Sequence, residues 1–174
     1  MAETGTLAKV TQVRDLGMIM IRADLERAGD AIAGAAGLPI PDTARVTGDG
    51  ARGLGWMSPD ELLMVLPVAE VGQTVRDLAD ALTGEHAMVQ DVSNMRCVFD
   101  VTGRKASQVL SKLCPVDFAA LPADGLRRTR AAQVACGIWR VPDGFRVIAF
   151  RSVTDYLRGI LENAAQAETD LDPR

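Results

Sequence analysis

The chain contains a single histidine, His86, and this residue limits the chemistry that the sequence can support. A Ser-His-Asp or Cys-His nucleophile would have to recruit His86 from the segment after a predicted helix, and no nucleophile elbow accompanies it. One histidine and three scattered cysteines also cannot assemble a usual zinc site. We therefore predict that His86 is exposed and that this chain has no catalytic residue and no metal site.

The three cysteines are Cys97, Cys114 and Cys136, and they have no close spacing. An odd number of separated thiols is typical of reduced cysteines in the cytosol. Cys97 and Cys136 lie inside apolar runs, where a free cysteine behaves as a small hydrophobic residue. We expect both side chains to pack in the core.

Residues 48–53, Gly-Asp-Gly-Ala-Arg-Gly, match the glycine pattern of dinucleotide-binding loops. That chemistry requires a strand before the glycines and a helix after them, so that backbone amides and the helix dipole meet the pyrophosphate. Here the segment leads into Leu54-Gly55-Trp56 and a predicted hairpin. The context predicts a mobile turn and no cofactor-binding residue.

Two kinds of charged residue remain as candidates. Asp91 and Asp100 lie at the ends of predicted strands, where either acid–base residues or solvated carboxylates occur.

Three arginines form a basic cluster ahead of a predicted strand, after a long loop over residues 115–126 that is apolar at two positions. Arginine and aromatic side chains often anchor interfaces. The candidate partner interface is therefore Phe118, Leu121, Arg127, Arg128 and Arg130. Two alternatives stay open: a solvated strand edge that discourages pairing, and a loop that only caps the core.

Composition excludes several classes of protein. A net charge of −4, a pI near 5.0 and an aromatic content of 4% do not indicate a nucleic-acid surface. The N-terminal residues lack a basic and apolar leader, and no run approaches the roughly 18 apolar residues of a membrane span. We expect a cytoplasmic protein with no membrane and no nucleic-acid partner.

A repeated segment indicates internal duplication. The pattern Trp-x-x-Pro-Asp occurs at 56–60 and again at 139–143, each time before an apolar run and an amphipathic helix. We predict one domain over 1–174 with two pseudo-repeat halves, about 15–91 and 92–165.

The first half predicts strands at 18–23, 44–47, 53–57, 61–66 and 87–91, with helices at 25–36 and 68–82. Asp24 is the expected cap of the first helix and Gly37 its stop. The second half predicts strands at 96–101, 129–139 and 145–150 and helices at 104–113 and about 152–165. Ser152 and Asp155 are the expected capping box of the last helix, and residues 167–174 are expected to fray. Each half therefore predicts an α+β fold of split-βαβ, ferredoxin-like type.

Four segments carry a family resemblance, and they occur in a fixed order: 56–63 (Trp-Met-Ser-Pro-Asp-Glu-Leu-Leu), 91–96 (Asp-Val-Ser-Asn-Met-Arg) leading into 99–103 (Phe-Asp-Val-Thr-Gly), 113–118 (Leu-Cys-Pro-Val-Asp-Phe) and 150–157 (Phe-Arg-Ser-Val-Thr-Asp-Tyr-Leu). With them, residues 15–165 resemble the gamma subunit of heterotetrameric sarcosine oxidase. The architecture is similar to the folate-binding domain of glycine-cleavage aminomethyltransferases.

The resemblance implies a non-catalytic subunit in an assembly with alpha, beta and delta chains. Such a complex oxidatively demethylates sarcosine to glycine, uses FAD, FMN and NAD, and passes the one-carbon unit to tetrahydrofolate. In that family the cofactors and the folate site belong to alpha and beta, and delta carries a zinc ion. Gamma has no assigned catalytic residues, so the resemblance places no site residue on this chain.

Two other classes remain open. One is a stand-alone folate-binding or one-carbon regulatory protein. The tetrahydrofolate-regulated branch of that class carries a Lys-Gly-Cys-x-x-Gly-Gln-Glu motif, whereas the cysteines here lie in Arg-Cys-Val, Leu-Cys-Pro and Ala-Cys-Gly. The other is a generic interaction module that forms a homo-oligomer when isolated.

Overall fold

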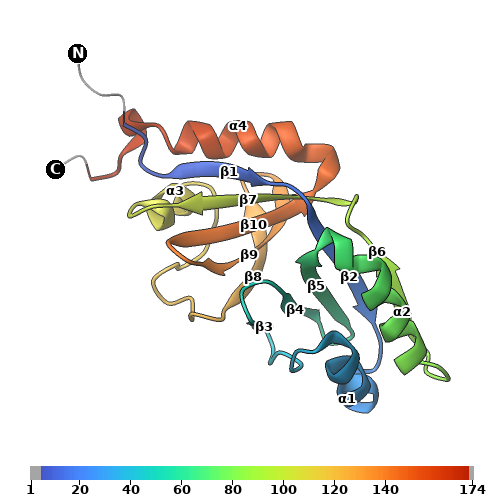
Figure 1. Cartoon of the computed structure of the whole chain (residues 1–174). Coiled ribbons are helices and arrows are strands. Elements are labelled where there is room, and N and C mark those ends of the chain that lie inside the picture. Colours follow the sequence, from blue (N-terminus) through green and yellow to red (C-terminus); the bar gives the residue numbers. More distant parts are fainter. Residues whose placement is uncertain (1–4, 173–174) are drawn as a thin grey trace. The chain divides into compact units, whose positions relative to one another are not determined.

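The computed structural model describes residues 5–172 and divides into two compact units (Figure 1). Asp15–Met95 form one of them, which we call the continuous unit. The other combines the residues up to Arg14 with the chain from Arg96 onward, and we call it the split unit. The prediction that the whole chain is a single domain stays a prediction.

The continuous unit is a five-stranded sheet with two helices. Its elements are β2 (Leu16–Arg22), α1 (Leu25–Ala36), β3 (Val46–Gly48), β4 (Gly53–Ser58), β5 (Glu61–Pro67), the 3₁₀ turn η1 (Val68–Glu70), α2 (Val71–Ala81) and β6 (Met88–Asp91). The strand order is β3-β4-β5-β2-β6, with antiparallel neighbours throughout. Every element predicted for this half is present.

Helix α1 begins and ends where its sequence predicts. The Asp24 carboxylate accepts hydrogen bonds from the amides of Glu26 and Arg27, at 3.1 and 3.2 Å, and so satisfies two free donors of the first turn. Gly37 ends the helix with φ 68°, a left-handed conformation that favours glycine. Ile32 on the inner face of the helix is fully buried. The cap and the stop therefore fix where α1 begins and ends, and the buried Ile32 marks the face that packs in the core.

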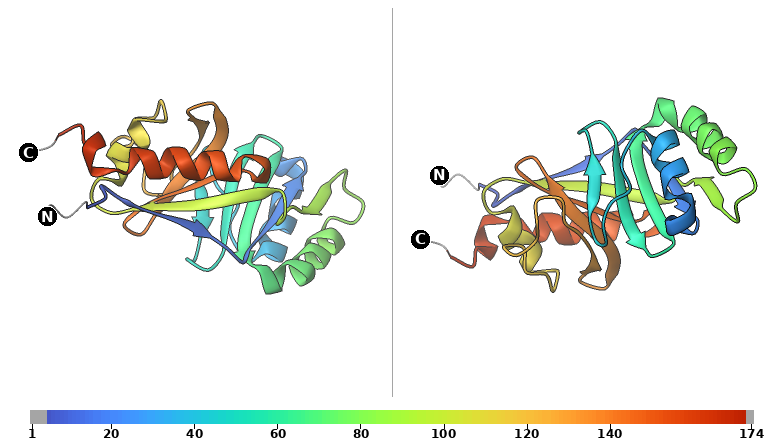
Figure 2. Two further views of the ribbon diagram at one scale, coloured as in Figure 1. Left: turned by 90° about the horizontal axis from the view of Figure 1, so that it is seen from above. Right: turned by 90° about the horizontal axis from the view of Figure 1, so that it is seen from below.

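The split unit repeats this plan with one strand taken from the start of the chain. Its elements are β1 (Lys9–Val13), β7 (Arg96–Thr102), α3 (Ala106–Ser111), β8 (Leu126–Ala131), β9 (Val134–Val141), β10 (Gly144–Phe150), η2 (Arg151–Val153), α4 (Thr154–Ala164) and η3 (Ala167–Thr169). The strand order is β1-β7-β10-β9-β8, again antiparallel. Figure 2 shows α4 running along β1 and β7 on one side of this sheet.

The two units match strand by strand. In sheet order, β3, β4, β5 and β2 correspond to β8, β9, β10 and β7, and the remaining edge position is filled by β6 in one unit and by β1 in the other. The registers agree at the ends of the central strands: Arg22 pairs with Glu61 and Met88, and Thr102 pairs with Gly144 and Lys9. The α+β, ferredoxin-like prediction is confirmed.

The two tryptophans occupy corresponding strands, as the repeat predicts. Trp56 lies in β4 and Trp139 in β9, each just before a Pro-Asp turn. The hairpins differ in detail. A register shift between Trp56 and Ser58 interrupts the first hairpin, whereas Asp143 adopts φ 63° in the turn of the second, which pairs regularly.

Three predictions for the second half are wrong. The single strand expected at 129–139 is two strands, β8 and β9, because the chain reverses at Ala132, which has φ 51° without a glycine to signal it. The helix expected at 104–113 is only Ala106–Ser111. The capping box at Ser152 does not form, since this residue lies in η2 and α4 begins at Thr154 with no side-chain cap.

The expectation of a frayed C-terminus is wrong for residues 167–172, while 173–174 lie outside the described residues. Lys112 donates hydrogen bonds to the carbonyls of Ala164 and Thr169 and to the Thr169 hydroxyl. Lys105 pairs with the Asp170 carboxylate. Both lysines flank α3, far from residues 167–172 in the sequence. The polar composition of these six residues alone therefore did not reveal the side chains that hold them.

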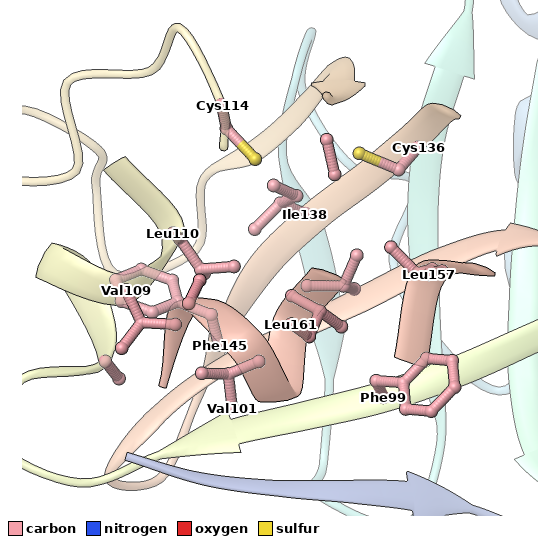
Figure 3. Packing of buried hydrophobic residues seen from close by; sticks show 14 of the residues in the cluster. Phe99, Val101, Val109, Leu110, Cys114, Cys136, Ile138, Phe145, Leu157 and Leu161 are labelled. Atoms are coloured by element: carbon pink, nitrogen blue, oxygen red, sulfur yellow. The ribbon is translucent and has the colours of Figure 1, made fainter. Parts of the chain in front are cut away.

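Each unit has its own apolar core between sheet and helices. The core of the split unit contains Phe99, Val101 and Ile138 from the sheet and Leu157 and Leu161 from α4 (Figure 3). Within the described part of the chain, no helix has both the length and the apolar character that crossing a bilayer requires.

Candidate functional site

A depression of about 850 Å³ lies in the continuous unit where β2 ends and α1 begins. The turn between β4 and β5 and the segment leading into β6 complete its wall. The chain places six polar side chains around it: Arg22, Asp24, Glu26, Arg27, Asp60 and His86. His86 is exposed, as predicted.

Both arginines of this depression form ion pairs. Arg22 Nη2 lies 2.5 Å from Asp60 Oδ2, and Arg27 Nη2 lies 2.6 Å from Glu85 Oε2. The hydrogen bond from Arg22, followed by one from the Ser58 hydroxyl, lowers the pKa of Asp60 below its usual range. A carboxylate with a lowered pKa is a weak base near neutral pH, so this arrangement favours an ion pair over proton transfer.

A corresponding depression of about 680 Å³ lies in the split unit. It is formed by the end of β7, the turn between β9 and β10, and the start of β1. The backbone contact is also shared: the Gly103 amide donates to the Asp143 carbonyl at 2.8 Å, as the Ala23 amide does to the Asp60 carbonyl at 3.1 Å. Among residues 5–172, however, no ion pair joins Lys9 or Arg104 of this depression to a carboxylate.

The cysteines lie in the core and not at a site open to substrate. Cys97, Cys114 and Cys136 are all buried, which confirms the core prediction made for the first and last of them. Figure 3 shows the sulfur atoms of Cys114 and Cys136 directed toward each other. The Cys114 thiol hydrogen-bonds to Cys136, which raises the pKa of Cys114, and burial raises it further. The same bond lowers the pKa of Cys136.

The glycine-rich segment forms the turn between β3 and β4, as predicted. Asp49 Oδ1 accepts hydrogen bonds from the amides of Ala51 and Arg52, at 3.0 and 2.8 Å. Arg52 in turn pairs with Glu70 and donates to the Ala36 carbonyl at 3.4 Å. The chain continues into a strand and not into a helix, so the glycines lack the amide cradle that a pyrophosphate requires.

The two candidate aspartates take part in structural contacts. Asp91 Oδ1 accepts hydrogen bonds from the Ser93 amide and hydroxyl, at 2.9 and 2.6 Å. Asp100 forms a two-pronged ion pair with Arg146, at 2.8 and 2.9 Å. Among the residues that the structure describes, no group of three or more His, Cys, Asp or Glu side chains is placed to hold a metal ion.

The predicted interface residues separate into two environments. Phe118 and Leu121 are buried in the core of the split unit, and the Phe118 ring meets Phe145 edge-on at 4.9 Å. Arg127, Arg128 and Arg130 lie exposed on β8, an edge strand. The two apolar residues therefore act in the packing of their loop, and a docking role for the three arginines stays a prediction.

The sequence reasoning missed Arg140, which anchors that loop. Arg140 Nε donates to the Leu121 carbonyl at 3.0 Å, and its Nη2 donates to the Phe118 carbonyl at 2.7 Å. Its guanidinium also lies 5.0 Å from the ring centre of Phe145. Arg140 directly follows Trp139 in the repeated motif, where an arginine replaces the apolar Met57 of the first copy. This difference between the copies was the available signal.

Two split-βαβ units in one chain define the class of fold. The structure is similar to that of a glycine cleavage system aminomethyltransferase T from Bartonella henselae, with a TM-score of 0.68 and 15% identity over 91% of this chain and 46% of that chain. At that identity the similarity shows the fold alone.

The chain belongs to the sarcosine oxidase, gamma subunit family, whose family model matches residues 22–168. It is 32% identical to a sarcosine oxidase subunit gamma from Arthrobacter sp., over 78% of this chain and 70% of the relative. It is also similar to a chain of the heterotetrameric sarcosine oxidase from Corynebacterium sp. U-96, with a TM-score of 0.87 and 25% identity over 95% of this chain and 87% of that chain. The resemblance read from the sequence is confirmed.

Proposed function

We propose that this chain is the non-catalytic gamma subunit of a heterotetrameric sarcosine oxidase and acts by docking onto alpha, beta and delta subunits. One observation carries the proposal: nearly the whole chain, 95% of it, superposes on a chain of such an assembly with a TM-score of 0.87. The match extends over both units, and its TM-score exceeds the 0.68 found for the aminomethyltransferase. The activity of the complex is the oxidative demethylation of sarcosine to glycine.

The placement of the polar side chains supports a role without chemistry of its own. In the larger depression both arginines are held in ion pairs, and the thiols lie in a core. We place FAD, FMN, NAD and tetrahydrofolate on the partner subunits, none on this chain, and the complex in the cytoplasm. The turn at 48–53 supports this assignment, because it lacks a following helix.

The aminomethyltransferase fold keeps one alternative, a stand-alone folate-binding protein. A calorimetric titration of the isolated chain with tetrahydrofolate distinguishes the docking subunit from the folate-binding protein. We expect no heat of binding for a docking subunit, and micromolar binding would favour the alternative.

Co-expression with tagged alpha-, beta- and delta-like chains tests the proposal directly. We expect this chain to co-purify in an equal molar amount. Alone, we expect it to be folded, colourless and inactive toward sarcosine. A bound-flavin spectrum or sarcosine turnover by the isolated chain would contradict the non-catalytic role, and absence from the purified complex would contradict the docking role.

A further inference from the structure

Two thiols of the split unit, those of Cys114 and Cys136, are directed toward each other (Figure 3). Cys114 follows α3, whereas Cys136 lies in β9, so the pair joins two elements that are separate in the sequence. The Cys114 thiol forms a hydrogen bond with the Cys136 sulfur. Two sulfur atoms in such a contact are a short movement away from the roughly 2.05 Å of a disulfide bond.

Backbone hydrogen bonds hold the two cysteines in this position. The Ala132 amide, in the turn between β8 and β9, donates to the Leu113 carbonyl at 2.8 Å and so ties the segment of Cys114 to that turn. The Ala131 amide donates a hydrogen bond to the Cys136 sulfur. The approach of the two sulfur atoms is therefore fixed by the backbone as well as by the side-chain conformers.

The hydrogen bonds give the two thiols different roles. Cys136 accepts from both the Cys114 thiol and the Ala131 amide, and these two donors lower its pKa against the opposing effect of burial. Cys114 keeps its proton, because the hydrogen bond with Cys136 and burial both raise its pKa. The thiolate is the form of cysteine that attacks an oxidant. Cys136 is thus the residue suited to react first, and Cys114 is the neighbour suited to close a disulfide.

The pair lies at the boundary of the core. Cys114 is 4% and Cys136 is 7% exposed, whereas Leu110 and Ile138, which also belong to this core, are fully buried. A small oxidant therefore needs only a local opening of the loop after α3 to reach the sulfur atoms, without unfolding of the sheet.

Cys97 is an internal control within the same core. It is 4% exposed, as Cys114 is, and its thiol donates to the Phe150 carbonyl at 3.5 Å. It therefore offers the same burial with its proton engaged by a backbone oxygen and not by a second sulfur.

The continuous unit shows that the fold does not require two thiols at these positions. Cys114 stands before the proline that follows the first helix of its unit, where the continuous unit has Leu38. Cys136 stands three residues before the tryptophan of the repeated motif, where the continuous unit has Gly53. An aliphatic side chain and a glycine meet the packing needs of that unit, so the sulfur pair is a feature of the split unit alone.

We propose that Cys114 and Cys136 form a redox modification site, in which hydrogen peroxide converts the two thiols into a disulfide. The inference goes beyond the proposed function and does not depend on it. The site requires no cofactor and no catalysis by this chain, because the peroxide itself is the oxidant.

The reaction has two steps. The Cys136 thiolate attacks one peroxide oxygen, so that an S–O bond forms, the O–O bond breaks, and the departing hydroxide takes up the proton that Cys136 released. The Cys114 sulfur then attacks the resulting sulfenic acid of Cys136, the S–O bond breaks, and the oxygen leaves as a second water with the proton of Cys114. The two sulfur atoms together lose two electrons, and the peroxide gains them.

The experiment treats the purified full chain with hydrogen peroxide, blocks the remaining thiols with N-ethylmaleimide, and identifies the products by mass spectrometry without reduction. We expect the free thiols to fall from three to one, with Cys114 and Cys136 joined and Cys97 alkylated. Dithiothreitol should restore all three thiols. We expect Cys136 to be oxidised at least about tenfold faster than Cys97.

Three serine variants test the order of the steps, since a hydroxyl keeps a hydrogen-bonding group and removes the sulfur. In Cys114→Ser, we expect the sulfenic acid to persist at Cys136, where dimedone captures it. In Cys136→Ser, we expect no sulfenic acid at Cys114 at the peroxide concentration that closes the disulfide in the wild type. Cys97→Ser is the matched control, and its disulfide should form within about twofold of the wild-type rate.

Four results would overturn the proposal. They are three thiols that stay free under peroxide, equal oxidation rates for Cys97 and Cys136, disulfides that include Cys97 as often as the expected pair, and a sulfenic acid at Cys114 in Cys136→Ser with none at Cys136 in Cys114→Ser. The comparison of Cys97 with Cys136 is made within the wild-type chain, so it decides the matter even if a variant melts early. Because the isolated chain is measured, a negative result leaves the docking function standing.

Discussion

The continuous and split units build the same sheet with different pieces of chain. In the continuous unit the edge strand β6 follows α2 directly, whereas in the split unit nothing described after α4 enters the sheet, and β1 from the start of the chain takes that position. The comparison shows that the edge position of an antiparallel sheet requires a strand with a particular register and side-chain pattern. It does not require that this strand come from a particular place in the sequence. A strand of suitable pattern fills the edge wherever the chain supplies it.

The second difference concerns charge. In the depression at the end of β2, Arg22 and Arg27 each form an ion pair, while the depression at the end of β7 is lined by Lys9, Arg104 and Asp143. Within the described residues, the two cations of the split-unit depression form no ion pair, whereas both arginines of the other depression do. The two units therefore share a strand order and differ in the charged side chains that line these depressions.

Removing residues 1–14 should have the largest effect. This deletion takes away β1, and with it Ala8 and Val10 from the split-unit core, so we expect that unit to lose more than about 3 kcal/mol. Hydrogen exchange should accelerate in β7 and leave β2 and β5 unchanged. A deletion that ends at Gly5 is the control, since Leu7, which bonds to the Ala165 carbonyl, remains. Unchanged protection of β7 would contradict the equivalence of β1 and β6.

Phe99 and Ile19 occupy corresponding central-strand positions and allow a matched test of the two cores. Both side chains are fully buried. We expect Phe99→Ala to cost about 3–5 kcal/mol and Ile19→Ala about 2–5 kcal/mol in denaturant titrations. Exchange should localise the first loss to the split unit and the second to the continuous unit. Equal loosening of both units by either change would show that the two cores do not respond separately.

Arg140→Ala tests the anchor of the loop that contains Phe118 and Leu121. The continuous unit has Met57 at the corresponding position and so lacks this anchor. The change removes two hydrogen bonds from a guanidinium to loop carbonyls, and we expect about 2–4 kcal/mol of destabilisation together with faster proteolysis at 115–125. Arg127→Ala is the matched surface control, with an expected change within about 0.5 kcal/mol. If both variants behave alike, the loop is held by Phe118 and Leu121 alone.

The smallest expected effect concerns residues 167–172, the polar tail. It follows α4 at the point in the chain where the continuous unit has the strand β6 after α2. The hydrogen bond from Lys105 lowers the pKa of Asp170, so the ionised carboxylate favours the bound tail. That contribution is present above the ordinary aspartate pKa of about 3.9 and is lost as the pH falls through the lowered folded value. We expect limited proteolysis to release the tail faster at pH 3 than at pH 7. Asp170→Asn should release it at both values, and an unchanged pH dependence in that variant would assign the effect to another group.

Local signals in the sequence predicted most elements, and non-local ones were missed. Asp24 and Gly37 mark α1 because a cap and a left-handed stop act within a few residues. The alternation in Lys9–Val13 is visible, but its partner Thr102 lies beyond the whole continuous unit, so no local pattern assigns the strand. Ala132 adopts a left-handed conformation that its residue type does not favour, which hid the turn between β8 and β9.

The candidate site was less predictable than the fold. The arginines of β8 were found because charge is visible in the sequence, but their division between two faces depends on pairing with Ala135 and Ile138. Phe118 and Phe150 are both phenylalanines near polar residues, and only the packing shows that the first is buried and the second exposed. The sequence therefore identified the right kinds of anchor and could not assign their exposure.

The position of β1 also has a consequence for synthesis on the ribosome. This strand is translated before the continuous unit, but its partner β7 follows only after Asp15–Met95. At about 5–20 residues per second, the interval is on the order of 4–20 s. The continuous unit, whose strands are contiguous in sequence, has time to fold during that interval while β1 has no native neighbour. During this interval the unpaired β1 is exposed to other nascent chains on the same messenger RNA. The yield of folded protein should therefore depend on elongation rate more strongly than the yield of a rearranged chain in which this strand follows α4.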